Sequence, residues 1–285
     1  MTEIERGTEF SAEDRGELRE ARRLLENPNL AIRLTSALGT PIEKGLKLLP
    51  QGWSDKVQGA VEISLQKALQ IAVQTLGPRK KPRRARLFLH KAAVMGSGGL
   101  GGVFGLAGIA AELPVSTTIM LRSIAEIARS EGADPASLEV RLDCLQVFAL
   151  GGRTPIDDAS ETGYYALRAL LATTLNQATA FIAEKGLTSQ GAPALVRFLS
   201  VIASRFSTIV SEKIAAMAVP AIGAAGGAMI NMVFISHFQN MARGHFKIRK
   251  LERKYGPEAV KREYLAQGGR KQEAGGRKKE QGQNS

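Results

Sequence analysis

Five polar side chains of this sequence stand beside long uncharged segments, and buried polar groups of that kind often carry a function. They are Glu112, Arg122, Glu126, Lys213 and Asn231. One interpretation pairs Glu112 or Glu126 with Arg122 inside a polar cavity. Lys213 and Asn231 bracket an uncharged segment and would line the same cavity. Two alternatives remain open, because Glu112 would also interact favourably with the N-terminus of a helix, and Arg122 and Glu126 have the spacing of a surface ion pair.

No recognisable catalytic or metal-binding motif accompanies these residues. The three histidines form no His-Glu-x-x-His motif, and neither a Gly-x-Ser-x-Gly elbow nor a Gly-x-x-x-x-Gly-Lys-Ser/Thr phosphate loop occurs. His245 shares a helical face with Phe234, Phe238 and Met241, which predicts a histidine satisfied within the core. The single cysteine, Cys144, excludes an internal disulfide and a multi-cysteine metal site. We therefore predict no catalytic residue, no metal and no cofactor, which favours a non-enzymatic protein over an enzyme.

Charge is distributed unevenly along the chain, whose formal net charge is +12. The first twenty residues carry seven acidic residues against three arginines. The first basic cluster comprises Arg79, Lys80, Lys81, Arg83, Arg84, Arg86 and Lys91, and the second comprises Arg243, Lys247, Arg249, Lys250, Arg253 and Lys254. Such clusters favour anionic partners. Only Phe88 lies within the first cluster, whereas base stacking requires interleaved aromatic residues, so we favour an anionic membrane surface over a nucleic acid.

Two uncharged, glycine-containing segments lie directly beside the basic clusters. Residues 92–111 contain seven glycines and follow the first cluster, and residues 214–238 precede the second. Both contain small-xxx-small spacings, such as Gly98/Gly102 and Gly223/Gly227, which allow helices to pack closely. Either segment is long enough to span a bilayer, and either could instead be buried in a soluble bundle.

The basic residues that flank these segments favour a location on the cytoplasmic side of a membrane. Because the first thirty residues contain no apolar signal segment, we do not expect secretion.

Helical periodicity and capping signals cover most of the chain. Helices are predicted over residues 54–76, 135–150, 164–183, 193–217, 229–255 and 258–265, with Pro220 and Gly256 among the breaks. No stretch alternates apolar and polar residues as a strand would. The sequence therefore predicts an all-α, multi-helix bundle that contains the two glycine-rich apolar segments, tightly packed as helices.

Four blocks in the chain form a recognisable series, namely Gly39-x-Pro41-Ile42-Glu43-Lys44, Ala111-Glu112-Leu113-Pro114, Val219-Pro220-Ala221-Ile222-Gly223-Ala224 and Ala242-Arg243-x-His245-Phe246. Together these blocks resemble the EcsC family. The resemblance covers roughly residues 30–264 and keeps the blocks in order. The family is named after a gene beside the subunits of a bacterial ABC transporter. The resemblance therefore implies a bacterial protein that is associated with the cytoplasmic side of a membrane. It also implies a transporter or secretion component as the partner, and it identifies no catalytic residues.

The chain divides in this interpretation into an acidic helical extension (1–29), an EcsC-like helical domain (30–265) and a disordered basic tail (266–285). We expect a non-enzymatic, membrane-associated accessory protein. The alternative is a soluble cytosolic helical protein with a small-ligand cavity around Glu112, Arg122 and Glu126, which could include a hydrolase.

Overall fold

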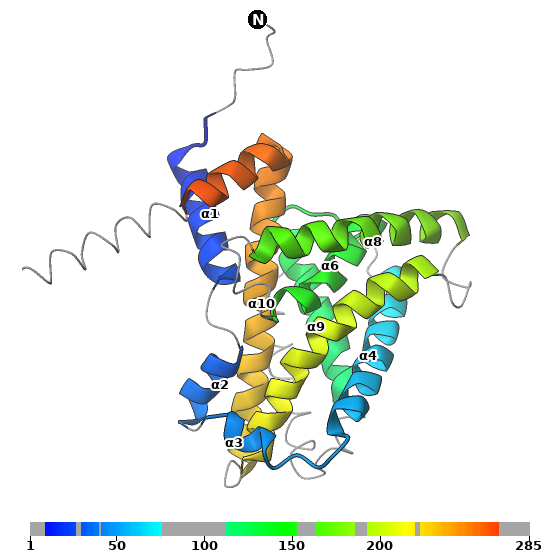
Figure 1. Cartoon of the computed structure of the whole chain (residues 1–285). Coiled ribbons are helices and arrows are strands. Elements are labelled where there is room, and N and C mark those ends of the chain that lie inside the picture. The colour runs from blue at the N-terminus through cyan, green and yellow to red at the C-terminus, as the bar shows by residue number, and fades with distance from the viewer. Residues whose placement is uncertain are drawn as a thin grey trace, which may run out of the picture.

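The computed structural model describes residues 9–26, 30–39, 41–75, 112–152, 163–185, 193–219 and 223–267. Within these ranges every regular element is a helix (Figure 1). The helices are α1 (Ala12–Leu25), α2 (Leu30–Leu38), α3 (Glu43–Leu46), α4 (Trp53–Thr75), α6 (Leu138–Leu150), α8 (Gly163–Lys185), α9 (Pro193–Ala218) and α10 (Gly223–Tyr255), together with helices 112–130 and 257–267. The all-α fold class predicted from the sequence is confirmed.

Proline and glycine mark the ends of the two longest helices, as the sequence predicts. α9 begins at Pro193 and ends at Ala218, just before Pro220. Proline cannot continue a helix because it lacks the N–H donor. α10 ends at Tyr255, and Gly256 then adopts a φ of +83°, a left-handed conformation that closes helices.

α6 begins later than the sequence predicts, at Leu138 rather than at Pro135. The Asp134 carboxylate accepts a hydrogen bond from the Ala136 N–H at 2.9 Å. This bond holds residues 135–137 in a turn, so Ser137 becomes the N-cap position. The aspartate therefore stabilises the turn before the helix and does not cap the helix itself.

α10 is 33 residues long and runs through the middle of the bundle for about 50 Å (Figure 1). α9 crosses it and also packs against α4, α6 and α8. Four phenylalanines meet where these helices approach one another, with ring centroids 5.0–6.4 Å apart. They are Phe148, Phe206, Phe234 and Phe238, all fully buried. This aromatic core fixes the helices that carry the polar side chains described below.

α1 packs closely along the C-terminal half of α10 (Figure 1). A Cβ atom on Gly244 would lie 2.9 Å from the carbonyl oxygen of Ala21 and 2.7 Å from Cγ of Leu25, so the contact requires a glycine. Leu18 and Ala21 are completely buried on the facing side of α1. The acidic residues Glu13, Asp14, Glu17 and Glu20 thus belong to a helix that is docked on the bundle.

Three ion pairs run along the α1–α10 contact. Asp14 contacts Lys254 at 2.6 Å, Glu17 contacts Lys250 at 2.8 Å and Glu20 contacts Lys247 at 2.7 Å. The carboxylates are three residues apart on α1, and the lysines are three or four apart on α10, so both rows follow one helical face. Three carboxylates of α1 therefore pair with three of the six residues of the second basic cluster.

Of the two glycine-rich segments, residues 92–111 lie outside the described residues, as does the first basic cluster. The second, residues 214–238, is divided between α9, which ends at Ala218, and α10, which begins at Gly223. The helix break predicted at Pro220 thus separates the segment into two helices, although α10 begins at Gly223 and not at the predicted Met229. Among the described helices, α9 alone is long and apolar enough to span a bilayer, with a mean hydropathy of 1.4, and 39% of that stretch is buried.

Candidate functional site

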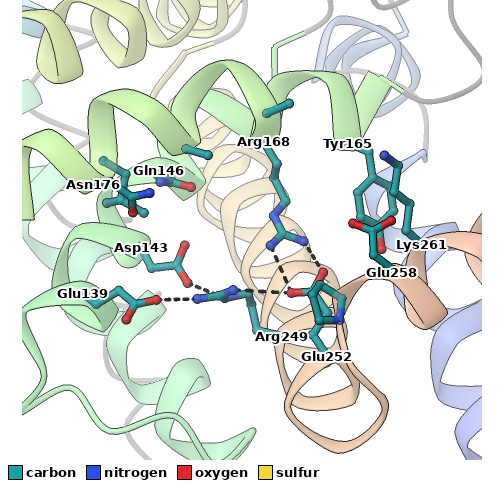
Figure 2. Close-up of a pocket in the computed structure, with 14 residues that line it drawn as sticks. Glu139, Asp143, Gln146, Tyr165, Arg168, Asn176, Arg249, Glu252, Glu258 and Lys261 are labelled. Carbon is teal, nitrogen blue, oxygen red and sulfur yellow. Dashed lines mark hydrogen bonds and ion pairs between the residues drawn. The ribbon is translucent and has the colours of Figure 1, made fainter. Parts of the chain in front are cut away.

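A polar pocket of about 270 Å³ lies between α6, α8, α10 and helix 257–267 (Figure 2). α6 contributes Glu139, Asp143 and Gln146 to its wall. α8 contributes Tyr165, Arg168 and Asn176, α10 contributes Arg249 and Glu252, and the last helix contributes Glu258 and Lys261. Ala169, Ala172 and Leu175 add an apolar strip along α8. The pocket therefore combines charged groups, amides and a phenol on four different helices.

A continuous chain of ion pairs forms one wall of the pocket, as the dashed lines in Figure 2 show. The Arg168 guanidinium donates to both carboxylate oxygens of Glu252, at 2.5 and 3.0 Å. Arg249 donates through Nε to Asp143 at 3.0 Å and through a terminal nitrogen to Glu139 at 2.8 Å. The bidentate geometry is the strongest form of this interaction and fixes α8 against α10.

A buried hydrogen-bonded relay extends from the pocket into the core. His245 Nε2 lies 3.0 Å from Asp143 Oδ1, and His245 Nδ1 lies 2.9 Å from the Tyr164 hydroxyl. Burial alone would raise the pKa of Asp143, but its interaction with His245 and the positive charge of Arg249 outweigh burial and lower the pKa to about 2. Asp143 is therefore a carboxylate at neutral pH.

The order Asp143–His245–Tyr164 resembles an acid–base triad in composition, but the terminal group is a buried phenol. Burial raises the pKa of Tyr164 well above its ordinary value, so the hydroxyl keeps its proton. His245 is completely buried and Tyr164 is 9% exposed. The relay satisfies three buried polar groups and links α6, α8 and α10. The sequence prediction that His245 is a core histidine agrees with this environment.

Lys213 and Glu112 form a second buried site, between α9 and helix 112–130. Lys213 Nζ lies 2.9 and 3.0 Å from the two Glu112 oxygens, and the side chains are 2% and 4% exposed. The ammonium group also lies 4.9 Å from the centroid of the Phe234 ring, a cation–π contact. The carboxylate thus compensates a cation that the aromatic core surrounds.

Of the five residues first considered for a polar cavity, the structure brings Glu112 and Lys213 into contact. Asn231 is fully buried on α10. Arg122 is exposed on helix 112–130, so it does not share the buried environment of Glu112, and Glu126 is half-buried on the same helix. The partner of Glu112 is therefore a lysine 101 residues away and not the nearby arginine.

The described members of the second basic cluster are largely engaged within the chain. Lys247 and Lys250 pair with α1, and Arg249 pairs with the pocket carboxylates. Arg243 donates to the Asn240 side chain at 3.1 Å. The seven residues of the first basic cluster lie outside the described residues.

The sequence reasoning missed the pocket, although one signal for it was present. Asp143 and Gln146 interrupt the otherwise apolar run of α6 from Leu142 to Leu150, and both are at least 97% buried. A charged residue within a buried helix requires a partner. Its partners His245 and Arg249 are about 100 residues away, so spacing alone could not identify them.

Among the described residues, no group of three or more His, Cys, Asp or Glu side chains has the arrangement of a metal site.

No curated protein and no solved structure matches the chain. The model of the EcsC protein family matches residues 13–251, which span α1 and nearly all of α10. The match includes Asp143, His245 and Arg249, and it covers well over half of the sequence. The chain therefore belongs to the EcsC protein family.

Proposed function

We propose that this chain is a non-enzymatic accessory protein that binds the cytoplasmic face of a bacterial membrane, with the α3 end of the bundle against the lipid. The α3 end comprises Ile32 on α2, the segment 44–48 around α3, and Met229 and Met232 near the start of α10. α2, α3 and the start of α10 lie together at the lower end of the bundle in Figure 1. Its partner there would be a transporter or secretion component, as the family resemblance implies.

The observation that carries this proposal is the exposure of apolar side chains next to lysines on α3 and directly after it. Leu46 is 39% exposed and Leu48 is 55% exposed, and Lys44 and Lys47 beside them are also exposed. Leucine and lysine side by side suit a membrane interface, where leucine enters the acyl boundary and lysine contacts the headgroups. A single exposed leucine is common on the surface of a soluble protein, but several exposed apolar side chains lie together at the α3 end.

The neighbouring elements extend the same surface. Met229 and Met232 are 44% and 42% exposed, and Ile32 is 51% exposed. α3 is held rigidly against α9, because a Cβ atom on Gly45 would overlap the carbonyl oxygen of Ala215. A rigid α3 presents its leucines without the entropic cost of ordering a loop on binding.

The first basic cluster supports the proposal through its place in the sequence. It lies between α4 and helix 112–130, and the uncharged residues 92–111 follow it directly. Each basic residue near an anionic leaflet contributes about 1 kcal/mol. The second cluster contributes less to the proposal because its cations pair with carboxylates of α1, α6 and α10.

Cosedimentation of the full chain with vesicles tests the proposal. We expect the protein to pellet with phosphatidylglycerol/phosphatidylcholine vesicles and to remain in solution with pure phosphatidylcholine. Leu46→Ser combined with Leu48→Ser should weaken binding at least tenfold, since apolar contact with the acyl boundary is lost. Leu170→Ser is the matched control, because Leu170 is 58% exposed on α8 at the opposite end of the bundle. A wild-type protein that never pellets would contradict the proposal.

Charge is tested separately on the first basic cluster. Replacing Arg83, Arg84 and Arg86 with glutamine should weaken vesicle binding by about a hundredfold, and high salt should have the same effect. Binding that resists both the triple replacement and salt would contradict a role for electrostatic attraction.

A further inference from the structure

We infer that the polar pocket between α6, α8, α10 and helix 257–267 is a binding site for a small organic cation, namely an ammonium compound that also carries an amide or hydroxyl group. This inference does not depend on membrane binding, because the helices that line the pocket meet away from the α3 end (Figure 1).

Gln146 is the first reason to expect a ligand. Its side chain lines the pocket, is only 3% exposed and forms no side-chain hydrogen bond within the described part of the chain. A primary amide offers two donors and one acceptor oxygen to whatever occupies the pocket. A ligand group that offers both an acceptor and a donor, such as an amide or a hydroxyl, complements it.

Tyr165 is the second reason. Its hydroxyl is buried and has no hydrogen-bond partner among the described residues, although the ring lines the same pocket. Burial, followed by the negative charge of Glu252, raises the pKa of Tyr165 above its ordinary value, so the phenol remains a donor. Figure 2 shows Tyr165 beside Glu258, and Gln146 beside Asn176 on the opposite side. Polar groups without protein partners thus stand on two sides of one cavity.

The charge of the ligand follows from the charges of the lining. Four carboxylates, Glu139, Asp143, Glu252 and Glu258, outnumber three cations, Arg168, Arg249 and Lys261, which leaves one negative charge. Both arginines are already matched by carboxylates at 2.5–3.0 Å, so neither provides an excess positive charge for an anion. Glu258 is exposed at the rim and forms no ion pair with other described residues. This arrangement attracts a cation.

The size of the pocket limits the ligand to a compact molecule. A volume of about 270 Å³ is smaller than the pockets that hold drug-sized ligands, which begin at roughly 300 Å³. The apolar strip of Ala169, Ala172 and Leu175 accommodates a short aliphatic part between the two polar sides.

Calorimetric titration of the full chain with three small probes tests the inference. Glycinamide carries an ammonium group and an amide, acetamide carries the amide alone, and acetate carries a negative charge. We expect glycinamide to bind at least tenfold more tightly than acetamide, and acetate not to bind. Acetate binding as tightly as glycinamide, or no glycinamide binding at 100 mM, would overturn the inference.

Two variants connect the binding to the pocket. Gln146→Leu should weaken glycinamide binding about tenfold, because two hydrogen bonds are lost. The same variant should melt at the same temperature as the wild type or higher, because the replaced amide forms no side-chain hydrogen bond with the described residues and leucine has a similar size. A residue with only a structural role would show the opposite pattern, in which melting falls and binding is unchanged. Gln177→Leu, at an exposed position of α8 outside the pocket, is the control.

Glu258→Gln tests the charge without disturbing the core, since Glu258 is exposed. We expect it to weaken glycinamide binding about fivefold and to leave acetamide binding unchanged. Glu184→Gln, which removes the same charge from an exposed site on α8 outside the pocket, should change neither. Equal effects of the two replacements would show that only the net charge of the protein matters, and the assignment of the cation to this pocket would fail.

Discussion

Lys213 and Glu112 face each other in a contact that excludes almost all solvent, with Nζ 2.9 Å from Oε1 and side chains 2% and 4% exposed. The pair joins α9 to helix 112–130, which follows residues 92–111 directly in the chain. A buried ion pair contributes little net stability compared with apolar residues, but breaking it leaves an uncompensated charge. The two residues therefore act as a matched unit.

Removing one member of this pair should be far more harmful than removing both. Lys213→Met alone should lower the free energy of unfolding by about 3–5 kcal/mol, because the Glu112 carboxylate stays buried without a cation. Adding Glu112→Leu to the same chain should recover most of that loss. Urea denaturation of the two single variants and the double variant measures the coupling, and additive effects would contradict it.

Gly244 tests the docking of α1 on α10. Gly244→Ala should destabilise the protein by about 1–3 kcal/mol, since the new Cβ would lie 2.9 Å from the backbone oxygen of Ala21. Gly59→Ala in α4 is the control, because no atom lies within 4 Å of its added Cβ. That replacement should stabilise the protein by about 0.5–1 kcal/mol through helix propensity. Thermal melting compares them, and a stabilising Gly244→Ala would show that α1 is not closely packed.

These helix–helix relationships mark the limit of what the sequence could predict. Pro193, Pro220 and Gly256 act on their own neighbours, so both ends of α9 and the C-terminal end of α10 could be predicted from them. Whether Glu112 pairs with Arg122 or with Lys213 depends on how distant helices pack, and helical spacing carries no such information. The local spacing favoured Arg122 as the partner of Glu112, whereas in the folded protein Lys213 forms the ion pair with Glu112.

The same limit applies to the charged segments. The sequence shows seven acidic residues near the N-terminus and a basic cluster near residue 250, yet nothing local indicates that they meet. In the fold, Asp14 and Lys254 are 240 residues apart and in contact at 2.6 Å. The pocket is likewise assembled by four helices, so its residues could not be grouped before the packing was known.

Glu212 should make the protein less stable as the pH rises. Burial raises its pKa from 4.5 to about 7, so the folded state favours the protonated carboxyl. The stability that this group contributes is fully present below pH 4.5 and is lost as the pH rises through 7. Glu212→Gln should therefore gain about 2 kcal/mol at pH 8 and nothing at pH 4. Denaturation at both pH values checks this, and an equal change at both would exclude the ionisation as the cause.

His237 should make the protein less stable as the pH falls, which is opposite to the effect of Glu212. Burial, followed by the nearby charge of Arg33, lowers its pKa from 6.5 to about 4, so the folded state disfavours the protonated ring. The stability that this group contributes is present above pH 6.5 and is lost as the pH falls through 4, by about 3 kcal/mol. His237→Gln should remove this part of the pH dependence. If the variant loses stability between pH 6.5 and 4 as steeply as the wild type, the histidine is not responsible.

The membrane orientation is tested most directly by a fluorescent label at the α3 end. Leu48→Cys introduces an exposed thiol, whereas the native Cys144 is completely buried and burial raises its pKa, so a thiol-reactive environment-sensitive dye should label residue 48 selectively. Leu170→Cys carries the same dye on α8 at the other end of the bundle. Adding phosphatidylglycerol vesicles should shift the emission to the blue and raise its intensity at position 48, and leave position 170 unchanged. No shift at position 48, or a larger shift at position 170, would contradict membrane binding through the α3 end.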